Sequence, residues 1–184
     1  MSGTEHPERR GPPMSADGWP EFLVHSEPFA ALYSELPALE GLVLRSVHLS
    51  PYGQAVTLRV ELPRFPDLAP PEWTEAGCDR FEAQIEFSAV EDLRMRGVPD
   101  STVVGIEFGP RIQTPERRIR LAVSGPEFSL DFTTHGLKVG RLNAYRSNDE
   151  DPYSARRWFV SPLDQRRHQG VLPPTTAKVF YERV

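Results

Sequence analysis

The stretch QAVTLRVELP, residues 54–63, decides the fold class of this chain. Apolar residues stand at every second position from Val56 to Leu62, and Thr57, Arg59 and Glu61 fill the positions between them. Side chains of a β-strand point alternately to its two faces, so this pattern predicts a half-buried strand. The preceding LVLRSVHLS predicts a second strand, and SPYGQ between the two predicts a hairpin turn.

The same alternation recurs along the chain as far as Tyr145. It is clearest in RFEAQIEF, residues 80–87, and weaker segments follow, separated by turn sequences such as SGPEF and THG. We expect about seven or eight strands between residues 42 and 145. Segments long enough for crossover helices do not separate them, and one-sided alternation is typical of antiparallel pairing. The sequence therefore predicts an α+β, mostly β fold: a curved antiparallel sheet or a sandwich with a short N-terminal helix.

The N-terminal part of the domain has a different period. Between residues 18 and 41, apolar residues such as Trp19, Phe22 and Phe29 recur at steps of three and four. This spacing predicts one or two short amphipathic helices, with Pro28 breaking the run or starting a second turn. They are expected to cover an edge or an end of the sheet.

The composition divides the chain into three parts. Residues 1–17 are polar and are expected to be a disordered lead-in. Residues 18–146 are expected to form a single domain. Residues 147–184 are interpreted as a C-terminal tail that is partly docked or disordered, because Trp158 and Phe159 are too apolar for a pure linker.

The overall charge and the single cysteine limit the classes of function. The net charge is -5, from 21 Lys+Arg against 26 Asp+Glu, which disfavours nucleic acid as the partner. One cysteine excludes an intramolecular disulfide and suits a reducing compartment. The polar N-terminus does not resemble a secretory signal, and no apolar stretch is long enough for a bilayer. We expect a cytoplasmic protein without membrane contact.

Local motifs for catalysis are absent from the sequence. There is no CxxC, HExxH, GxSxG or phosphate-binding glycine loop. His48 is interpreted as a solvent-facing strand residue, His135 as a turn residue, and Cys78 as a small core residue. We therefore expect no catalytic residue, no cofactor site and no metal site.

Three sets of neighbouring carboxylates could carry chemistry or bind a partner. Glu91 and Asp92 are adjacent in a strand and would converge only at a bulge. Asp149-Glu150-Asp151 lies in the polar start of the tail. Glu82 and Glu86 share one strand face, which is either an acidic docking surface or a solvated one, and we favour the solvated interpretation.

The proline-rich FPDLAPPEW, residues 65–73, links two predicted strands. Prolines in a long connection lower the conformational entropy of the unfolded chain. Phe65 and Trp73 are large enough to anchor the loop to a core. We interpret the stretch as a stiff strap that closes one end of the sheet, rather than as a displayed PxxP ligand.

Several of these features also occur in a fixed order. A Trp opens the first helix, a P-x-L-x-G turn leads into a strand, VTLRVELP follows, and then comes a P-x-x-W loop. The strand after that loop reads CDRFEAQIEFSAVEDLRMRG, and a late strand ends in an aromatic residue. This order, over about residues 19–146, resembles the Imm50 family, predicted immunity proteins of bacterial polymorphic toxin systems. The chain departs from the family pattern at Asp79 and Val98. The motif positions in this sequence are Trp19, Pro37, Leu39, Gly41, Pro70, Trp73 and Tyr145.

The resemblance implies a non-enzymatic, cytoplasmic protein that binds and neutralises a cognate toxin. It assigns Trp19 and Trp73 to folding and leaves the partner-binding residues and the oligomeric state open. Two alternatives remain at this point. One is a small-molecule-handling β-domain or hydrolase whose site assembles in space from His48, Glu82 or His135. The other is a scaffold protein that binds partners through Trp158 and Phe159 of its tail.

Overall fold

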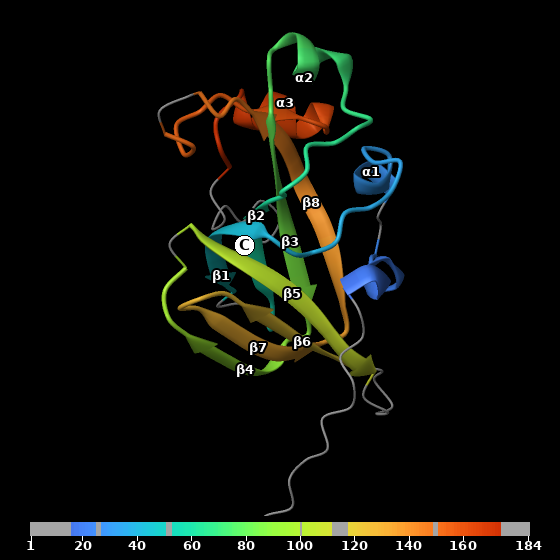
Figure 1. Ribbon diagram of the computed structural model, residues 1–184, viewed down its shortest axis with the longest axis vertical. Coiled ribbons are helices and arrows are strands. Elements are labelled where there is room, and N and C mark those ends of the chain that lie inside the picture. Colours follow the sequence, from blue (N-terminus) through green and yellow to red (C-terminus); the bar gives the residue numbers. More distant parts are fainter. Residues whose placement is uncertain are drawn as a thin grey trace, which may run out of the picture.

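The computed structural model describes residues 16–24, 27–50, 53–99, 101–111, 118–148 and 151–173. Most of the lead-in expected over residues 1–17, and the end of the tail after residue 173, lie outside these ranges. Within them strands predominate, and helices are few and short (Figure 1).

One antiparallel sheet dominates the molecule. Its nine described strands run in the spatial order β4-β7-β6-β5-β1-β2-β3-β8-β9, and every neighbouring pair is antiparallel. The predicted mostly β, antiparallel fold is thus confirmed, as a single curled sheet. The strands are β1 (Leu42–Leu49), β2 (Val56–Glu61), β3 (Arg80–Ser88), β4 (Glu91–Arg96), β5 (Thr102–Arg111), β6 (Ile119–Ser124), β7 (Ser129–Thr134), β8 (Gly136–Tyr145) and β9 (Trp158–Phe159).

The sheet curls so that its two halves share one apolar core. Phe87 of β3 meets Phe132 of β7 edge to face, with ring centres 5.1 Å apart. Four strands separate β3 from β7 in the sheet order, so this contact is possible only if the sheet folds back on itself. We call the side of the sheet that faces this core the inner face, and the opposite side the outer face. The alternating apolar residues of β2 and β3 lie on the inner face, as their period requires.

The N-terminal segment covers one side of the core. It forms a 3-10 helix, η1 (Ala16–Phe22), and a single turn, α1 (Glu27–Ala30). Proline interrupts helical hydrogen bonding, which explains why these helices are shorter than their apolar pattern suggests. Trp19 donates from Nε1 to the Pro37 carbonyl at 3.0 Å, and Phe22 stacks on Phe108 of β5. Within the described ranges, no helix has the length and hydropathy needed to cross a membrane.

The proline-rich connection between β2 and β3 lies at one end of the sheet (Figure 1). It contains a one-turn helix, α2 (Pro71–Glu75), which begins with a proline. Proline is common at the first position of a helix, because the N–H that it lacks would have no helical partner there. Trp73 of this turn is buried, and its ring lies 6.3 Å from that of Phe65 and 5.9 Å from that of Phe81. The two aromatic residues that we expected to anchor the strap thus contact each other, and Trp73 reaches the core.

After β8 the chain turns back over the sheet. β9 pairs with the end of β8, and α3 (Pro162–His168) follows, capped by the Ser161 hydroxyl, which accepts from the Asp164 amide. Phe159 of β9 is buried and Trp158 is half-buried. Residues 151–173 therefore lie against the sheet and form part of its surface. We call them the C-terminal segment.

Candidate functional site

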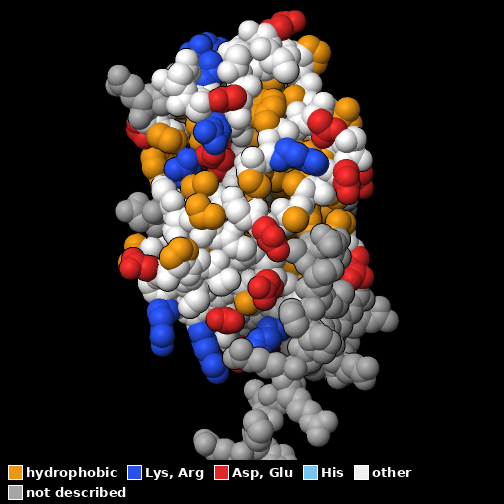
Figure 2. Space-filling view, in the orientation of Figure 1, with side chains coloured by type: hydrophobic (Ala, Val, Ile, Leu, Met, Phe, Trp, Pro, Cys, Tyr) orange, Lys and Arg blue, Asp and Glu red, His pale blue; other side chains and the backbone are white. Residues whose placement is uncertain are grey.

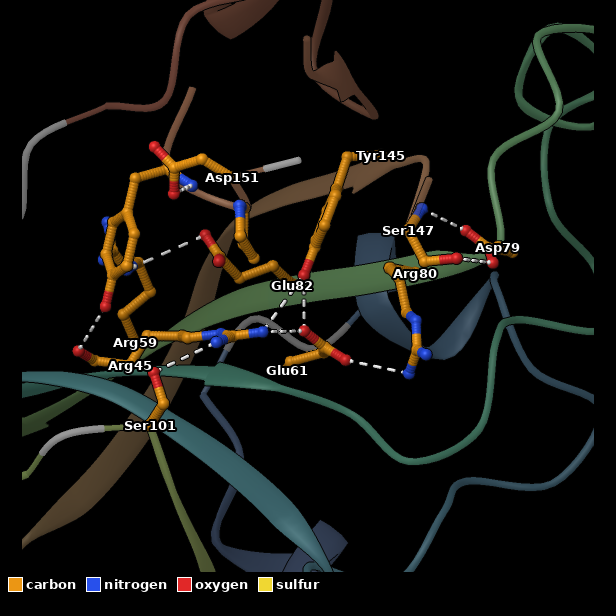
Figure 3. A network of polar contacts seen from close by, with 12 residues as sticks. Arg45, Arg59, Glu61, Asp79, Arg80, Glu82, Ser101, Tyr145, Ser147 and Asp151 are labelled. Atoms are coloured by element: carbon orange, nitrogen blue, oxygen red, sulfur yellow. Dashed lines mark hydrogen bonds and ion pairs between the residues drawn. The ribbon is translucent and has the colours of Figure 1, made fainter. Parts of the chain in front are cut away.

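Two glutamates stand side by side on the outer face. Glu61 of β2 and Glu82 of β3 are direct cross-strand partners, and their exposed fractions are only 4% and 2%. Like charges in this position repel each other, and buried charges are costly unless they are paired. Each carboxylate is flanked by two arginines, as Figure 3 shows in part. We call this group the charge cluster.

Glu61 is held from three sides. Arg45 reaches one carboxylate oxygen at 2.6 Å, Arg80 reaches the other at 3.2 Å, and the Tyr145 hydroxyl donates to the oxygen that Arg45 binds. Arg45 lies where β1 shifts register against β2, and such a bulge re-aims a side chain. Burial, and next the hydrogen bond to Glu61, raises the pKa of Tyr145 to about 12, so its proton stays on the hydroxyl at neutral pH.

Glu82 is held by a residue far away in the sequence. Arg157, from the C-terminal segment, lies 3.7 Å from Glu82, and Arg59 lies 3.9 Å from it on the other side. Burial raises the pKa of Glu82, and the two arginines oppose that shift. Burial likewise lowers the pKa of Arg157, against the attraction of Glu82. The attraction between Glu82 and Arg157 thus offsets part of the cost of burying these two groups.

Arg157 is almost completely enclosed, with an exposed fraction of 1%. Its Nη1 donates to the Asn143 side-chain oxygen at 3.2 Å, and its guanidinium carbon lies 3.9 Å from the centre of the Tyr145 ring. Tyr153 of the same segment places its ring 5.0 Å from the Arg59 guanidinium carbon. The C-terminal segment thus closes the outer face over Glu82.

This arrangement favours a structural role for the charge cluster over acid–base chemistry. Its carboxylates are occupied by guanidinium groups, and Glu82 is enclosed beneath Arg157. Among the described residues, no group of three or more His, Cys, Asp or Glu side chains is placed to hold a metal ion. The cluster connects β1, β2, β3 and β8 to the C-terminal segment.

The structure does not bring together the residues of the hydrolase hypothesis. His48 is half-buried opposite Thr57 on β1, and His135 is an exposed residue beside Arg118 in the turn before β8. Glu82 pairs with Asn143, near the opposite end of β8. Cys78 is buried just before β3, where its amide donates to the Trp73 carbonyl at 2.9 Å.

The solvated interpretation of the Glu82 and Glu86 face is wrong for Glu82. Glu86 is exposed, whereas Glu82 is buried because Arg157 covers it. The alternating pattern correctly placed Glu82 on the face opposite the core. It did not predict that Arg157 covers this side chain. In the sequence, this contact is signalled only by Arg157, an arginine directly before the apolar pair of β9. Strand periodicity does not connect that arginine to a glutamate on β3.

The two other carboxylate groups contact different parts of the structure. Glu91 forms an ion pair with Arg118 at 3.3 Å, and a register shift follows Glu91 in β4, with Asp92 at a φ of 54°. Of Asp149-Glu150-Asp151, only Asp151 lies within the described residues, where its carbonyl accepts from the Ala155 amide. The Asp151 carboxylate accepts from the Tyr153 amide at 3.0 Å and lies beside the charge cluster in Figure 3.

Comparison with protein families gives a match over most of the domain. Residues 25–145 match the family Imm50, described as Immunity protein 50, and this stretch covers more than half of the 184-residue chain. Neither a curated protein nor a solved structure matches the chain. The matched residues begin shortly after η1 and end at the last residue of β8. They contain most of the core, together with Glu61, Glu82 and Tyr145, but not Trp19, Phe22 or Arg157. The chain belongs to the Imm50 family of immunity proteins.

Proposed function

We propose that this protein binds a cognate bacterial toxin directly and neutralises it without any chemical turnover. The observation that carries this proposal is the Imm50 match over residues 25–145, since an immunity protein acts through a toxin partner. The enclosed charge cluster supports it, because its charged groups are engaged with one another instead of facing a substrate. We place this activity in the cytoplasm of a bacterium that carries the corresponding polymorphic toxin system.

The test uses the toxin domain encoded by the gene next to that of this protein. Expression of that domain alone should stop bacterial growth, and co-expression of the full chain should restore it. An inactivated form of the domain should bind the purified chain with one-to-one stoichiometry in calorimetry. An unrelated toxin domain is the control for both assays. If the chain neither rescues growth nor binds the neighbouring toxin, the proposal is overturned. Ligand and activity screens on the purified chain would then be the next step.

A further inference from the structure

The strand β4 forms a free edge of the sheet. Among the described strands it pairs only with β7, and it ends the strand order on that side. In Figure 1 it forms the lower margin of the sheet. At such an edge, alternate backbone N–H and C=O groups point outward and can bind another strand.

Apolar side chains are exposed at this edge. Met95 stands opposite Leu130, a core residue, yet 47% of Met95 is exposed because no described strand covers it on the other side. Val98, just after the strand, is 81% exposed. An edge that only prevents aggregation carries charge and does not need exposed apolar residues. A strand added beside β4 would cover Met95 on the inner face of the sheet.

The charges of β4 indicate what kind of strand fits. Arg94 and Arg96 stand opposite Asp131 and Ser129 on the outer face, and neither forms an ion pair with any residue that the structure describes. Basic side chains project from the margin that β4 forms in Figure 2. Pairing of β4 with a second copy of itself would bring these arginines together, which is unfavourable. An incoming strand with acidic side chains on the outer face is complementary to them.

The edge is also held in place before any partner arrives. Gly97, which directly follows β4, has a φ of 83°, and a Cβ on it would lie 2.0 Å from the Glu127 carbonyl oxygen. This close turn fixes the end of β4 against the start of β7. At the other end, the register shift between Glu91 and Arg94 interrupts the ladder. The regular edge is therefore short and preorganised, which lowers the entropic cost of adding a strand.

We propose that the toxin docks by adding an extended segment to the free edge of β4. Acidic side chains of that segment lie beside Arg94 and Arg96, and an apolar side chain covers Met95. Backbone hydrogen bonds supply affinity, and the alternating side chains supply specificity. This inference rests on the proposed function and names the surface through which it acts.

The test compares two variants of equal charge against the inactivated toxin domain encoded by the neighbouring gene. R94E/R96E reverses two charges at the edge, and K138E/R166E reverses two exposed charges on β8 and α3. β8 stands near the other end of the strand order from β4, and Figure 1 shows α3 at the opposite end of the molecule. Because like-charge contacts oppose binding, we expect R94E/R96E to raise Kd about tenfold or more and K138E/R166E to change it less than about threefold. Thermal unfolding of each variant checks that it is folded. Hydrogen exchange of the wild-type complex should show new protection of the β4 amides.

The outcomes separate the two proposals. If the wild-type chain does not bind the toxin, the proposed function fails and the docking edge fails with it. If the wild type binds, R94E/R96E binds equally well and the β4 amides gain no protection, the edge is wrong while the immunity function stands. Protection of β4 without toxin, together with a dimer mass in solution, would show that a second copy occupies the edge and would also overturn the inference.

Discussion

Replacing Arg157 with alanine should destabilise the fold strongly. The variant leaves Glu82 buried and removes a guanidinium that lies 3.7 Å from it. Breaking a buried ion pair from one side costs about 3–5 kcal/mol. Arg59 remains 3.9 Å from Glu82, which places the expected loss near the lower end, about 3 kcal/mol. For a chain of this size, such a loss corresponds to a Tm lower by about 6–12 °C.

The assay is urea unfolding followed by tryptophan fluorescence, with the free energies compared at the same pH. Arg156→Ala is the matched control, because Arg156 is the exposed neighbour of Arg157 and its guanidinium carbon lies over the Trp158 ring, 5.4 Å from the ring centre. The control should lose less than about 1 kcal/mol, as an exposed cation–π contact does. If R157A unfolds within about 1 kcal/mol of the wild type, Glu82 does not depend on its counter-charge and the buried ion pair does not stabilise the fold.

The loss of stability in R157A should also depend on pH. Burial raises the pKa of Glu82 in the folded state, so the folded protein binds that proton more tightly than the unfolded chain does. Ionised Glu82 therefore costs stability as the pH rises from the ordinary glutamate range through the raised pKa. Loss of Arg157 raises this pKa further. The deficit of R157A should be largest near neutral pH and should narrow as the pH falls, whereas a constant deficit would show that lost packing alone explains it.

Three further changes test other parts of the structure. Gly97→Ala places a methyl group 2.0 Å from the Glu127 carbonyl at a positive φ, so it should cost about 2–4 kcal/mol in the same urea assay. Tyr145→Phe removes the hydroxyl that donates to Glu61 and should cost about 1.5–3 kcal/mol, measured as the shift of the urea midpoint. Truncation after residue 148 removes the C-terminal segment and should lower Tm more than R157A does, because the buried Phe159 is lost as well. A truncated chain as stable as the wild type would contradict the structural role of the segment.

The charge cluster links the residues that match the family to the C-terminal segment, which lies outside the match. The Imm50 match ends at residue 145, yet Glu82 and Asn143 inside the match contact Arg157 outside it. We therefore propose that the folded unit of this protein includes the C-terminal segment rather than ending near residue 146. A chain shortened to the matched residues would expose a glutamate that is buried when the C-terminal segment is present.

Local pattern predicted much of the fold because each signal acts over a few residues. The two-residue period of residues 54–63 and 80–87 correctly identified β2, β3 and their inner faces. The turn at THG correctly separated β7 from β8. The order of motifs over residues 19–146 was sufficient to identify the family, which the match over residues 25–145 confirms.

Tertiary structure alone decided which polar residues are buried and which edge is free. Alternation places Glu61 and Glu82 on the outer face but carries no information about Arg157, which reaches Glu82 only after the chain has turned back over β8. Strand order likewise arises from pairing between distant segments, and it leaves β4 at the margin although β4 lies in the middle of the strand sequence along the chain. Both features depend on long-range contacts, which form only when the sheet forms. The charge cluster and the docking edge are therefore properties of the folded chain.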